Sequence, residues 1–522
     1  MNTQPTQINL RVEPAVAATP HLLRRAAAKA LSVAPDSIAM PVIRRRSIDA
    51  RQRNIIINLS LDIYPAGVTP PQPEPESAVL PKLPADAPAA IVVGCGPAGL
   101  FAALKLIESG VKPILLERGK DVDSRRKDVA NIARTQTIDP ESNYCYGEGG
   151  AGTFSDGKLY TRSHKRGPVD KVLKVLHAHG ADASILVDAH PHIGTDRLPY
   201  IIRSIRQAIE KAGGEVRFQT RVDSLILNSE GTQCEGVITQ SGEKIYGPVI
   251  LATGHSARDV YEFLHKLGVE MKPKGIAVGV RLEHPQHLID KVFYHNPSGR
   301  GKYLPPAEYS VLTRVDSRAV YSFCMCPGGI VIPASNSSSL LVVNGMSPAN
   351  RGSKWANTGL VVEVLPEDVE GDHPLRMMHY QQAIEQRFSA DADGSQNAPA
   401  QRMTDFVASR LSSSLPPTSY PPGIHSARID QLLPHAVATR MQTAFGEFGR
   451  KYRGYLSPEA TLIGCETRTS APVQVSRDPA TLNHITVSGL YPCGEGAGYA
   501  GGIVSAAIDG MRCAQSLVDN RN

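Results

Sequence analysis

Residues 90–119 read AIVVGCGPAGLFAALKLIESGVKPILLERG, and this stretch carries the strongest structural signal in the chain. A short apolar run enters the motif Gly94-x-Gly96-x-x-Gly99, a helical pattern follows it, and a second apolar run ends in Glu117. A strand, a glycine turn, a helix and a second strand with a terminal acid together form a dinucleotide-binding βαβ unit. The sequence therefore predicts an α/β protein built on a Rossmann-like domain.

Each glycine of the motif has a separate physical task. Gly94 permits the tight turn, Gly96 lets the backbone approach a pyrophosphate, and Gly99 lets the helix pack close to the strand. The pyrophosphate then lies at a helix N-terminus, where free N–H groups and the helix dipole favour an anion. Glu117 can accept hydrogen bonds from both hydroxyls of a ribose, so a free 2′-hydroxyl suits the site better than a 2′-phosphate. The predicted nucleotide-binding residues are Gly94, Gly96, Pro97, Ala98, Gly99, Glu117 and Arg118.

Later segments extend this unit. After a helical stretch that ends at residue 212, short strands are expected at 215–218 and 222–227, and an apolar strand at 248–251 runs into Ala252-Thr253-Gly254. Near the C-terminus, residues 489–502 read GLYPCGEGAGYAGG, and a helical run closes the chain.

This order of segments resembles the FAD domain of the glutathione-reductase-like flavoprotein superfamily. The resemblance implies that Thr253-Gly254 supports the cofactor from a middle strand and that Glu495 holds the ribityl chain. It also implies that the last helix points its N-terminus at the flavin N1/O2 edge, where N–H groups stabilise the charge of reduced flavin. The residues assigned to the cofactor in this way are Thr253, Gly254, Gly494, Glu495, Gly501, Gly502 and Ile503.

A closer resemblance covers nearly the whole chain. Residues 144–159 read YCYGEGGAGTFSDGKL, and further blocks are GVRLEHP at 279–285, FCMCPGG at 323–329 and VNGMS at 343–347. These blocks are similar to those of a bacterial FAD-dependent dehydrogenase family, also described as NAD(FAD)-utilising dehydrogenases. The resemblance implies a small N-terminal domain, a flavin domain, and an inserted domain that carries the substrate region.

The chain divides accordingly into a discontinuous FAD-binding domain, an inserted mixed α+β substrate domain and an N-terminal βαββ module. The expected boundaries are 1–64 for the ferredoxin-like module, 65–88 for a linker, 89–160, 195–270 and 460–522 for the FAD-binding domain, and 161–194 and 271–459 for the inserted domain. The linker contains eight prolines and is expected to be extended, so the module should be tethered to the flavin domain rather than built into it.

The N-terminal module carries the positive charge of the chain. Residues 1–53 hold nine basic and three acidic residues, which equals the formal net charge of +6 of the whole protein. The pattern predicts a helix at 22–31 and a strand pair at 38–43 and 54–63 on either side of a polar turn that includes Arg44–Arg46.

The glycine loop that ends at Lys158 is the first candidate for chemistry. Gly149, Gly150 and Gly152 let its backbone lie close to the isoalloxazine, while Asp156 and Lys158 supply polar groups. Lys158 could stabilise reduced flavin or orient an acidic substrate. In the alternative interpretation, Asp156 and Lys158 simply pair with each other.

Arg281 is the second candidate, as a clamp for a carboxylate or phosphate. Strand alternation puts Arg281 and Glu283 on one face, so the alternative is an ion pair between these two residues. Tyr499 is a further aromatic residue that could cover the flavin ring.

Composition bounds the class of protein. The charged and hydrophobic fractions are ordinary, and no apolar run approaches the roughly 20 residues that span a bilayer. Eight scattered cysteines suit a reducing cytoplasm, and Cys324-x-Cys326 is the only close pair. Because that pair lacks a second pair of ligands, no metal site is expected. We expect a cytoplasmic protein without a membrane partner.

The leading hypothesis is an FAD-dependent oxidoreductase that transfers hydride through flavin N5 to or from a small-molecule substrate. Since no second glycine motif follows a strand, NAD(P)H would have to bind transiently as the electron donor. The alternative is that Arg44–Arg46 dock RNA or another macromolecule, which the flavin then modifies. We favour the small molecule, because the module lacks the interleaved aromatic residues that stack on bases.

Overall fold

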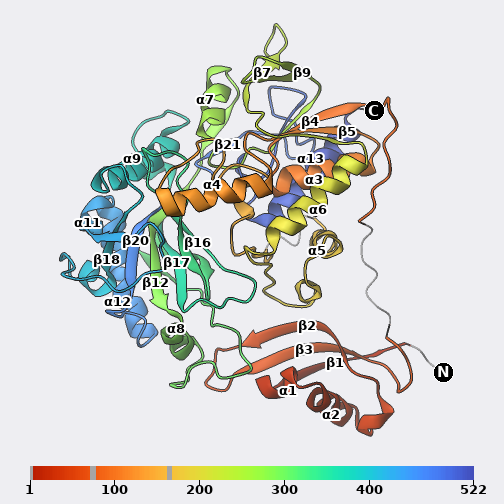
Figure 1. Ribbon diagram of the computed structural model, residues 1–522, viewed down its shortest axis with the longest axis vertical. Coiled ribbons are helices and arrows are strands. Elements are labelled where there is room, and N and C mark those ends of the chain that lie inside the picture. The colour runs from red at the N-terminus through yellow and green to blue at the C-terminus, as the bar shows by residue number, and fades with distance from the viewer. Residues whose placement is uncertain (1–3, 71–77, 162–166, 522) are drawn as a thin grey trace.

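The computed structural model describes residues 4–70, 78–161 and 167–521. It contains an N-terminal module, a parallel-sheet domain and an inserted domain, and the last two share one continuous body (Figure 1). Residues 71–77, the most proline-rich part of the expected linker, lie outside the described residues.

The parallel-sheet domain is built on five parallel strands in the order β22-β10-β4-β5-β6, which confirms the predicted βαβ unit. Helices α3 and α13 cross in close contact against this sheet. A Cβ at Gly510 would lie 2.0 Å from the carbonyl oxygen of Ala98, so glycine is needed where the two helices approach. The elements are β4 (Ala89–Val93), α3 (Pro97–Glu108), β5 (Lys112–Leu116), α4 (Val122–Thr135), α5 (Val169–Ala178), α6 (Leu198–Lys211), β6 (Glu215–Arg217), β10 (Val249–Leu251), α7 (Arg258–Lys266), β22 (Leu490–Pro492) and α13 (Ile503–Asp519).

A small antiparallel sheet lies between β6 and β10 in the chain. Its strands are β7 (Val222–Leu227), β8 (Cys234–Thr239) and β9 (Lys244–Tyr246).

The inserted domain is centred on a seven-stranded sheet in the order β13-β14-β17-β12-β20-β18-β19. Its neighbours pair antiparallel except β18 and β19, which are parallel. The strands are β12 (Ile276–Pro285), β13 (Leu312–Val315), β14 (Arg318–Cys326), β17 (Trp355–Val364), β18 (Ala398–Arg402), β19 (Ile424–Ser426) and β20 (Thr461–Glu466), with a separate pair β15 (Ile330–Pro333) and β16 (Val343–Met346). The helices are α8 (Gln286–Phe293), α9 (Arg376–Asp391), α10 (Met403–Val407), α11 (Ile429–Leu432) and α12 (His435–Lys451).

The chain crosses between these two domains twice, at adjacent places. The crossings are β11 (Met271–Pro273) and β21 (Val473–Val475), which pair antiparallel. β20 pairs with β12 and β18, so the inserted domain reaches past the expected end at residue 459. The apolar run of β20 is fully buried, as suits an inner strand of the inserted sheet.

Helix α5 also departs from the expected boundaries. Its residues Val172, Val175 and Leu176 are buried in the same core as α3 and α13. This segment was expected in the inserted domain, but its apolar face packs against the parallel-sheet domain.

The N-terminal module is an antiparallel sheet in the order β1-β3-β2 with two helices against it. The second strand is longer and later than expected, so Arg44–Arg46 lie in an exposed strand and not in a turn. Their charges interrupt the apolar pattern, which is why the sequence placed the strand too early. The elements are β1 (Thr6–Val12), α1 (Pro14–Ala18), α2 (Pro20–Leu31), β2 (Val42–Asp49) and β3 (Ile56–Ile63).

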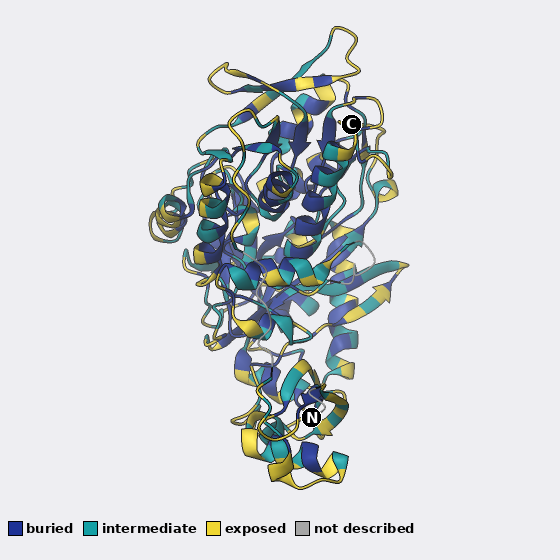
Figure 2. Ribbon diagram, turned by 90° about the vertical axis from the view of Figure 1, so that its right-hand side faces the viewer, coloured by how far each residue is buried: buried dark blue, intermediate teal, exposed yellow. Residues whose placement is uncertain are grey.

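The module is docked as well as tethered, as Figure 2 shows at the lower end of the molecule. The Arg46 N–H donates to the carbonyl of Val187 (2.8 Å), and the Ala189 N–H donates to the carbonyl of Arg46 (2.9 Å). The Arg46 side chain also pairs with Asp188 at 2.7 Å. The expectation of a merely tethered module was therefore wrong.

Candidate functional site

The loops that follow β4, β5, β10 and β22 meet at one edge of the parallel sheet, the edge where open α/β sheets bind their ligands. Gly94 has φ +103°, and a Cβ there would lie 2.4 Å from the Ala252 carbonyl oxygen. A Cβ at Gly99 would lie 1.9 Å from the Gly94 carbonyl oxygen. Packing alone therefore requires glycine at both positions.

Gly96 is different. Its φ is −81°, which any residue can adopt, and a Cβ there would meet nothing closer than the Gly150 Cα at 3.8 Å. Helix α3 begins directly after it at Pro97, and the N–H groups of Ala98 and Gly99 lie in its first turn, where no preceding carbonyl is available. The structure thus has room for a Cβ at Gly96, directly before a helix N-terminus whose first N–H groups have no intrahelical partner.

Glu117 lies at the end of β5 and ties three segments together. Its side chain accepts hydrogen bonds from the N–H groups of Cys95 (2.9 Å), Gly119 (2.9 Å) and Gly147 (3.0 Å). The residue is 5% exposed. The Glu117 carboxylate therefore holds the three loops together around the expected ribose position, independently of any ligand.

Arg118 forms part of the wall of a cavity of about 280 Å³ beside β5. Its guanidinium lies 4.1 Å from the Tyr146 ring centre and donates to Glu141 and Asp259. The cavity is lined by Arg118, Gly119, Lys120, Asp139, Glu141, Ser142, Gln219, Arg221 and Gln240.

The glycine loop packs against the starts of both long helices. Gly149 has φ +81°, and its N–H donates to the carbonyl of Cys95 at 2.8 Å. A Cβ at Gly152 would lie 3.4 Å from the Ile503 side chain, next to Pro97. The structure therefore brings the predicted glycine loop against Gly96 and the first turn of α3.

A buried arginine that the sequence analysis missed holds this loop. Arg125 of α4 is 0% exposed, and its guanidinium donates to the Thr153 hydroxyl and to five backbone carbonyls. Burial lowers the pKa of Arg125 to about 10, and the group still carries its charge at neutral pH. The carbonyls belong to Asn143, Tyr144, Gly147, Glu148 and Gly150, at 2.8–3.2 Å.

The ends of β10 and β22 abut at Gly254 and Gly496. A Cβ at Gly496 would lie 2.6 Å from the carbonyl oxygen of Gly254, which follows Thr253. Glu495 lies between Gly494 and Gly496, and its carboxylate is 3.9 Å from the His255 ring. Burial raises the pKa of Glu495 to about 7 and lowers the pKa of His255 to about 4.

The start of α13 lies next to this acid. Gly501 donates its N–H to the hydroxyl of Ser505 at 3.1 Å, so this N–H is already used. Cβ atoms at Gly501 and Gly502 would meet nothing within 4 Å. The N–H groups of Gly502 and Ile503, which were expected to face the flavin, lie at the start of α13, where a helix has no carbonyl partner for them.

The Tyr499 ring lies under Arg477, 3.8 Å from its guanidinium, and its hydroxyl donates to the Val475 carbonyl.

Asp156 and Lys158 pair at 2.7 Å, as the alternative interpretation had it. Asp156 is 0% exposed and also binds Arg351 at 3.1 Å. Against the effect of burial, Lys158 and Arg351 lower the pKa of Asp156 to about 2. Lys158 reaches across to the inserted domain, where it donates to the carbonyl of Met325.

Arg281 is 0% exposed, and protein groups take up its donors. It pairs with Glu466 of β20 at 2.9 Å and donates to Asn357 at 2.8 Å and to the Cys324 carbonyl at 2.7 Å. The alternative pairing with Glu283 was wrong, because the adjacent strand supplies the nearer acid. The guanidinium is thus engaged as a structural group and does not fit the expected substrate clamp.

A small cavity of about 60 Å³ lies where the glycine loop meets the inserted domain. It joins Ala151, Phe154 and Ser155 of the loop to His255 and to Glu466 and Arg468. The candidate site therefore extends between the two domains.

Glu385 of α9 joins the two domains at one end of this region. It is 0% exposed and accepts hydrogen bonds from Arg258 of α7 (2.8 and 2.9 Å) and from Arg468 (2.9 and 3.1 Å). Thr467 donates a further bond at 2.6 Å. Against the effect of burial, the two arginines lower the pKa of Glu385 to about 2.

This shift predicts a pH dependence of stability. Because the folded pKa lies below the ordinary value of 4.5, the carboxylate stabilises the fold above about pH 4.5 and loses that contribution as the pH falls toward 2. The difference in unfolding free energy between the wild type and Glu385→Gln should shrink by about 3 kcal/mol over this range. Urea unfolding at several pH values measures it; a difference that stays constant with pH would contradict the prediction.

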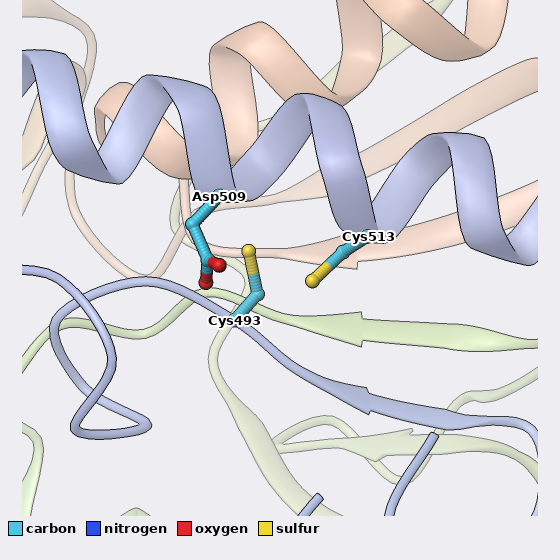
Figure 3. Close-up of side chains that lie close together, drawn as sticks. All are labelled: Cys493, Asp509 and Cys513. Atoms are coloured by element: carbon cyan, nitrogen blue, oxygen red, sulfur yellow. The ribbon is translucent and has the colours of Figure 1, made fainter. Parts of the chain in front are cut away.

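Cys493 has a close neighbour that the sequence did not indicate. Figure 3 shows Cys513 and Asp509 of α13 pointing toward Cys493, and their ligand atoms lie within 4.8 Å of one another. The Asp509 carboxylate is already bound by Arg477 (2.7 and 2.9 Å) and by the Gly494 N–H (2.8 Å). The Cys513 thiol and burial raise the pKa of Cys493, which indicates a packed and unreactive thiol beneath the β22 loop.

Comparison with known proteins gives one family match for the inserted domain and one for the N-terminal module. The model described as "FAD-dependent protein, C-terminal domain-like" matches residues 275–469, and a domain of unknown function (DUF8436) matches residues 4–64. The first match agrees with the observed end of the inserted domain better than with the expected one.

An uncharacterized protein of Clostridium beijerinckii is 38% identical over 526 residues, which cover 96% of both chains. Among solved structures, a geranylgeranyl bacteriochlorophyll reductase-like protein from Thermoplasma acidophilum is similar with a TM-score of 0.35 and 14% identity, over 83% of this chain and 79% of that one. CtdE in complex with FAD is similar with a TM-score of 0.32 and 12% identity, over 82% and 84% of the two chains. Both structural likenesses are too weak to bear on function.

Across residues 4–70, 78–161 and 167–521, no helix combines the length and the apolar composition required to cross a bilayer.

Proposed function

Because this chain belongs to the same family as the Clostridium beijerinckii protein and carries an FAD-dependent protein, C-terminal domain-like region, we propose that it is an FAD-dependent oxidoreductase. The observation that supports this most is a pair of glycines that the protein's own packing does not require. Side chains at Gly96 and Gly501 would meet no atom within 3.7 Å, and both glycines lie at helix N-termini. A bound anionic cofactor explains why both positions lack a Cβ.

The residues present fit FAD in its expected orientation. The N–H groups of Ala98 and Gly99 would bind the pyrophosphate, Glu117 the adenosine ribose and Glu495 the ribityl chain, with Gly502 and Ile503 near the flavin. When bound, FAD supplies hydride transfer at its N5 atom. Lys158, fixed by Asp156, would orient an acidic group of a small-molecule substrate. Arg281 would position strand β14, whose carbonyl at Cys324 it binds next to Lys158.

The direct test is the cofactor of the purified full-length protein. We expect a yellow protein whose released flavin co-migrates with FAD and whose bound flavin is reduced by NADH or NADPH acting as a transient donor. A colourless protein that FAD does not reconstitute would overturn the proposal.

A substitution at Gly96 separates cofactor binding from folding. Gly96→Ala should leave the unfolding free energy within about 0.5 kcal/mol, because the Cβ would make only an ordinary contact with the Gly150 Cα at 3.8 Å, but weaken FAD binding by at least about tenfold. Titration of the apoprotein with FAD by flavin fluorescence measures the affinity. Gly446→Ala is the control, since its Cβ would make ordinary contact in α12, far along the chain from the motif. Equal FAD affinity of the two variants would contradict the prediction.

The alternative, docking of a macromolecule by the N-terminal module, gains little support from the structure. Arg44 pairs with Asp62, Arg46 with Asp188, and Arg51 with Asp49. Charges that are neutralised within the protein contribute little to phosphate binding.

A further inference from the structure

Strand β14 contains an irregularity where it faces the candidate site. Its pairing with β17 passes from Phe323 opposite Gly359 to Cys326 opposite Asn357, so β14 has one residue more than its partner. Cys324, within this bulge, has φ +45° and is partly exposed. A left-handed conformation costs a non-glycine residue roughly 1–2 kcal/mol, so neighbouring groups must hold it.

Two cations hold the bulge from both domains. Arg281 donates to the carbonyl of Cys324 (2.7 Å) and approaches the Cys326 sulfur (3.2 Å), while Lys158 donates to the carbonyl of Met325. The Cys326 sulfur is fully buried. Arg281 and Lys158 are themselves anchored by Glu466 and Asp156.

This environment shifts the pKa values of the two cysteines in opposite directions. The hydrogen bond from the Cys326 thiol lowers the pKa of Cys324 to about 5, and Lys158 and Arg281 add to the effect against burial and Asp156. The same bond and burial raise the pKa of Cys326. The surroundings therefore favour the thiolate at the partly exposed Cys324 over the buried Cys326. Burial and, to a smaller extent, a charge on Cys324 raise the pKa of Glu495.

We propose that Cys324 and Cys326 form a redox-active dithiol that reduces disulfide compounds, with Cys324 as the attacking thiolate and Cys326 as the resolving thiol. Because one residue separates them, the Cα atoms of Cys324 and Cys326 lie at most about 7 Å apart, near the upper end of the range that a disulfide spans. The Cys326 thiol also turns back toward Cys324 and donates to its carbonyl at 3.4 Å. The geometry thus suits an intrachain disulfide between them.

The reaction is a pair of thiol–disulfide exchanges. The Cys324 thiolate attacks one sulfur of a disulfide R–S–S–R, which forms a Cys324–S–S–R bond and releases R–S⁻. Cys326 then attacks the Cys324 sulfur and forms the Cys324–Cys326 disulfide. The second R–S⁻ leaves and takes the proton of Cys326. The dithiol is oxidised by two electrons, and the substrate is reduced to one thiol and one thiolate, which takes its proton from water. Return of the electrons from reduced flavin rests on the proposed function, but the exchange itself does not.

The test uses the reduced full-length protein and 4,4′-dithiodipyridine as the probe disulfide. Trypsin releases residues 319–351 as one peptide, whose only cysteines are Cys324 and Cys326. We expect this peptide of the wild type to carry an intrachain disulfide, and that of Cys326→Ser to carry a pyridylthio adduct on Cys324. Below pH 7, Cys324 should react at least about tenfold faster than the partly exposed Cys145 of the same molecule.

Three outcomes would overturn the proposal. They are a stable adduct on the wild-type peptide, an adduct on Cys326 in Cys324→Ser that forms as fast as the wild-type disulfide, and equal rates at Cys324 and Cys145. Circular dichroism of each variant establishes that it is folded. Since the readout is a peptide mass, a failure of the dithiol is distinguishable from a failure to bind FAD.

Discussion

Replacing Arg125 by methionine should lower the free energy of unfolding by about 3–5 kcal/mol and abolish retention of the cofactor. Methionine fills a similar volume but removes a donor from five backbone carbonyls between residues 143 and 150, and those of Asn143 and Tyr144 have no other donor among the described residues. Each unsatisfied buried carbonyl costs about 1–3 kcal/mol, and the loop can recover part of that cost only by opening to water. Urea unfolding and FAD titration measure the two effects.

Arg126→Met is the matched control, because Arg126 is the next residue of the same helix and is exposed. It should change stability by no more than about 0.5 kcal/mol. Arg125→Lys should recover only a small part of the loss, since an ammonium cannot reproduce the planar set of five donors. If Arg125→Met unfolds at the same urea concentration as Arg126→Met, the role assigned to Arg125 is wrong.

Glu385→Gln should cost about 3–5 kcal/mol at neutral pH. The carboxylate is the shared acceptor of Arg258 and Arg468, and its loss leaves two largely buried cations facing a neutral amide. Because Arg258 belongs to the parallel-sheet domain and α9 to the inserted domain, the loss should also loosen the contact between the two domains. Urea unfolding measures the first effect, and hydrogen exchange at α7 and α9 measures the second.

Glu262→Gln provides the control for this change. It removes the same charge from an exposed position of α7, one turn from Arg258. Its effect should stay within about 0.5 kcal/mol. A Glu385→Gln protein as stable as the control would show that the two arginines find other partners.

The βαβ unit could be predicted because its signal is local. The apolar run of β4, the turn at Gly94 and the apolar face of α3 follow one another within the chain, and each fits one element. The closing helix α13 was predicted for the same reason. The predicted domain boundaries were wrong where a strand pairs with strands that are distant in the sequence. The apolar run of β20 fits either sheet equally well, and only its pairing with β12 and β18 assigns it to the inserted domain.

The groups that hold the site were harder to find for a physical reason. Arg125 lies on the buried face of α4 together with Val122, Val129 and Ile132. A charged residue among apolar ones on a helix face indicates a buried charge. The partners of Arg125 could still not be predicted, because they are backbone carbonyls and every residue has one. Glu385 likewise lies on the buried face of α9, and nothing local identifies Arg258 as its partner. Cys493 and Cys513 meet only because β22 and α13 lie side by side.

The antiparallel pairing of β11 with β21 limits how the two domains can move. A single connecting segment would let the inserted domain swing about many axes, whereas two paired segments behave as one twisted ribbon. A swing of the inserted domain would break the backbone hydrogen bonds between β11 and β21. The motion of lowest energy is therefore a small twist about the long axis of the paired strands. Entry of a substrate should then depend on rearrangement of loops and side chains, on nanosecond to microsecond timescales, and not on a slow opening of the whole molecule.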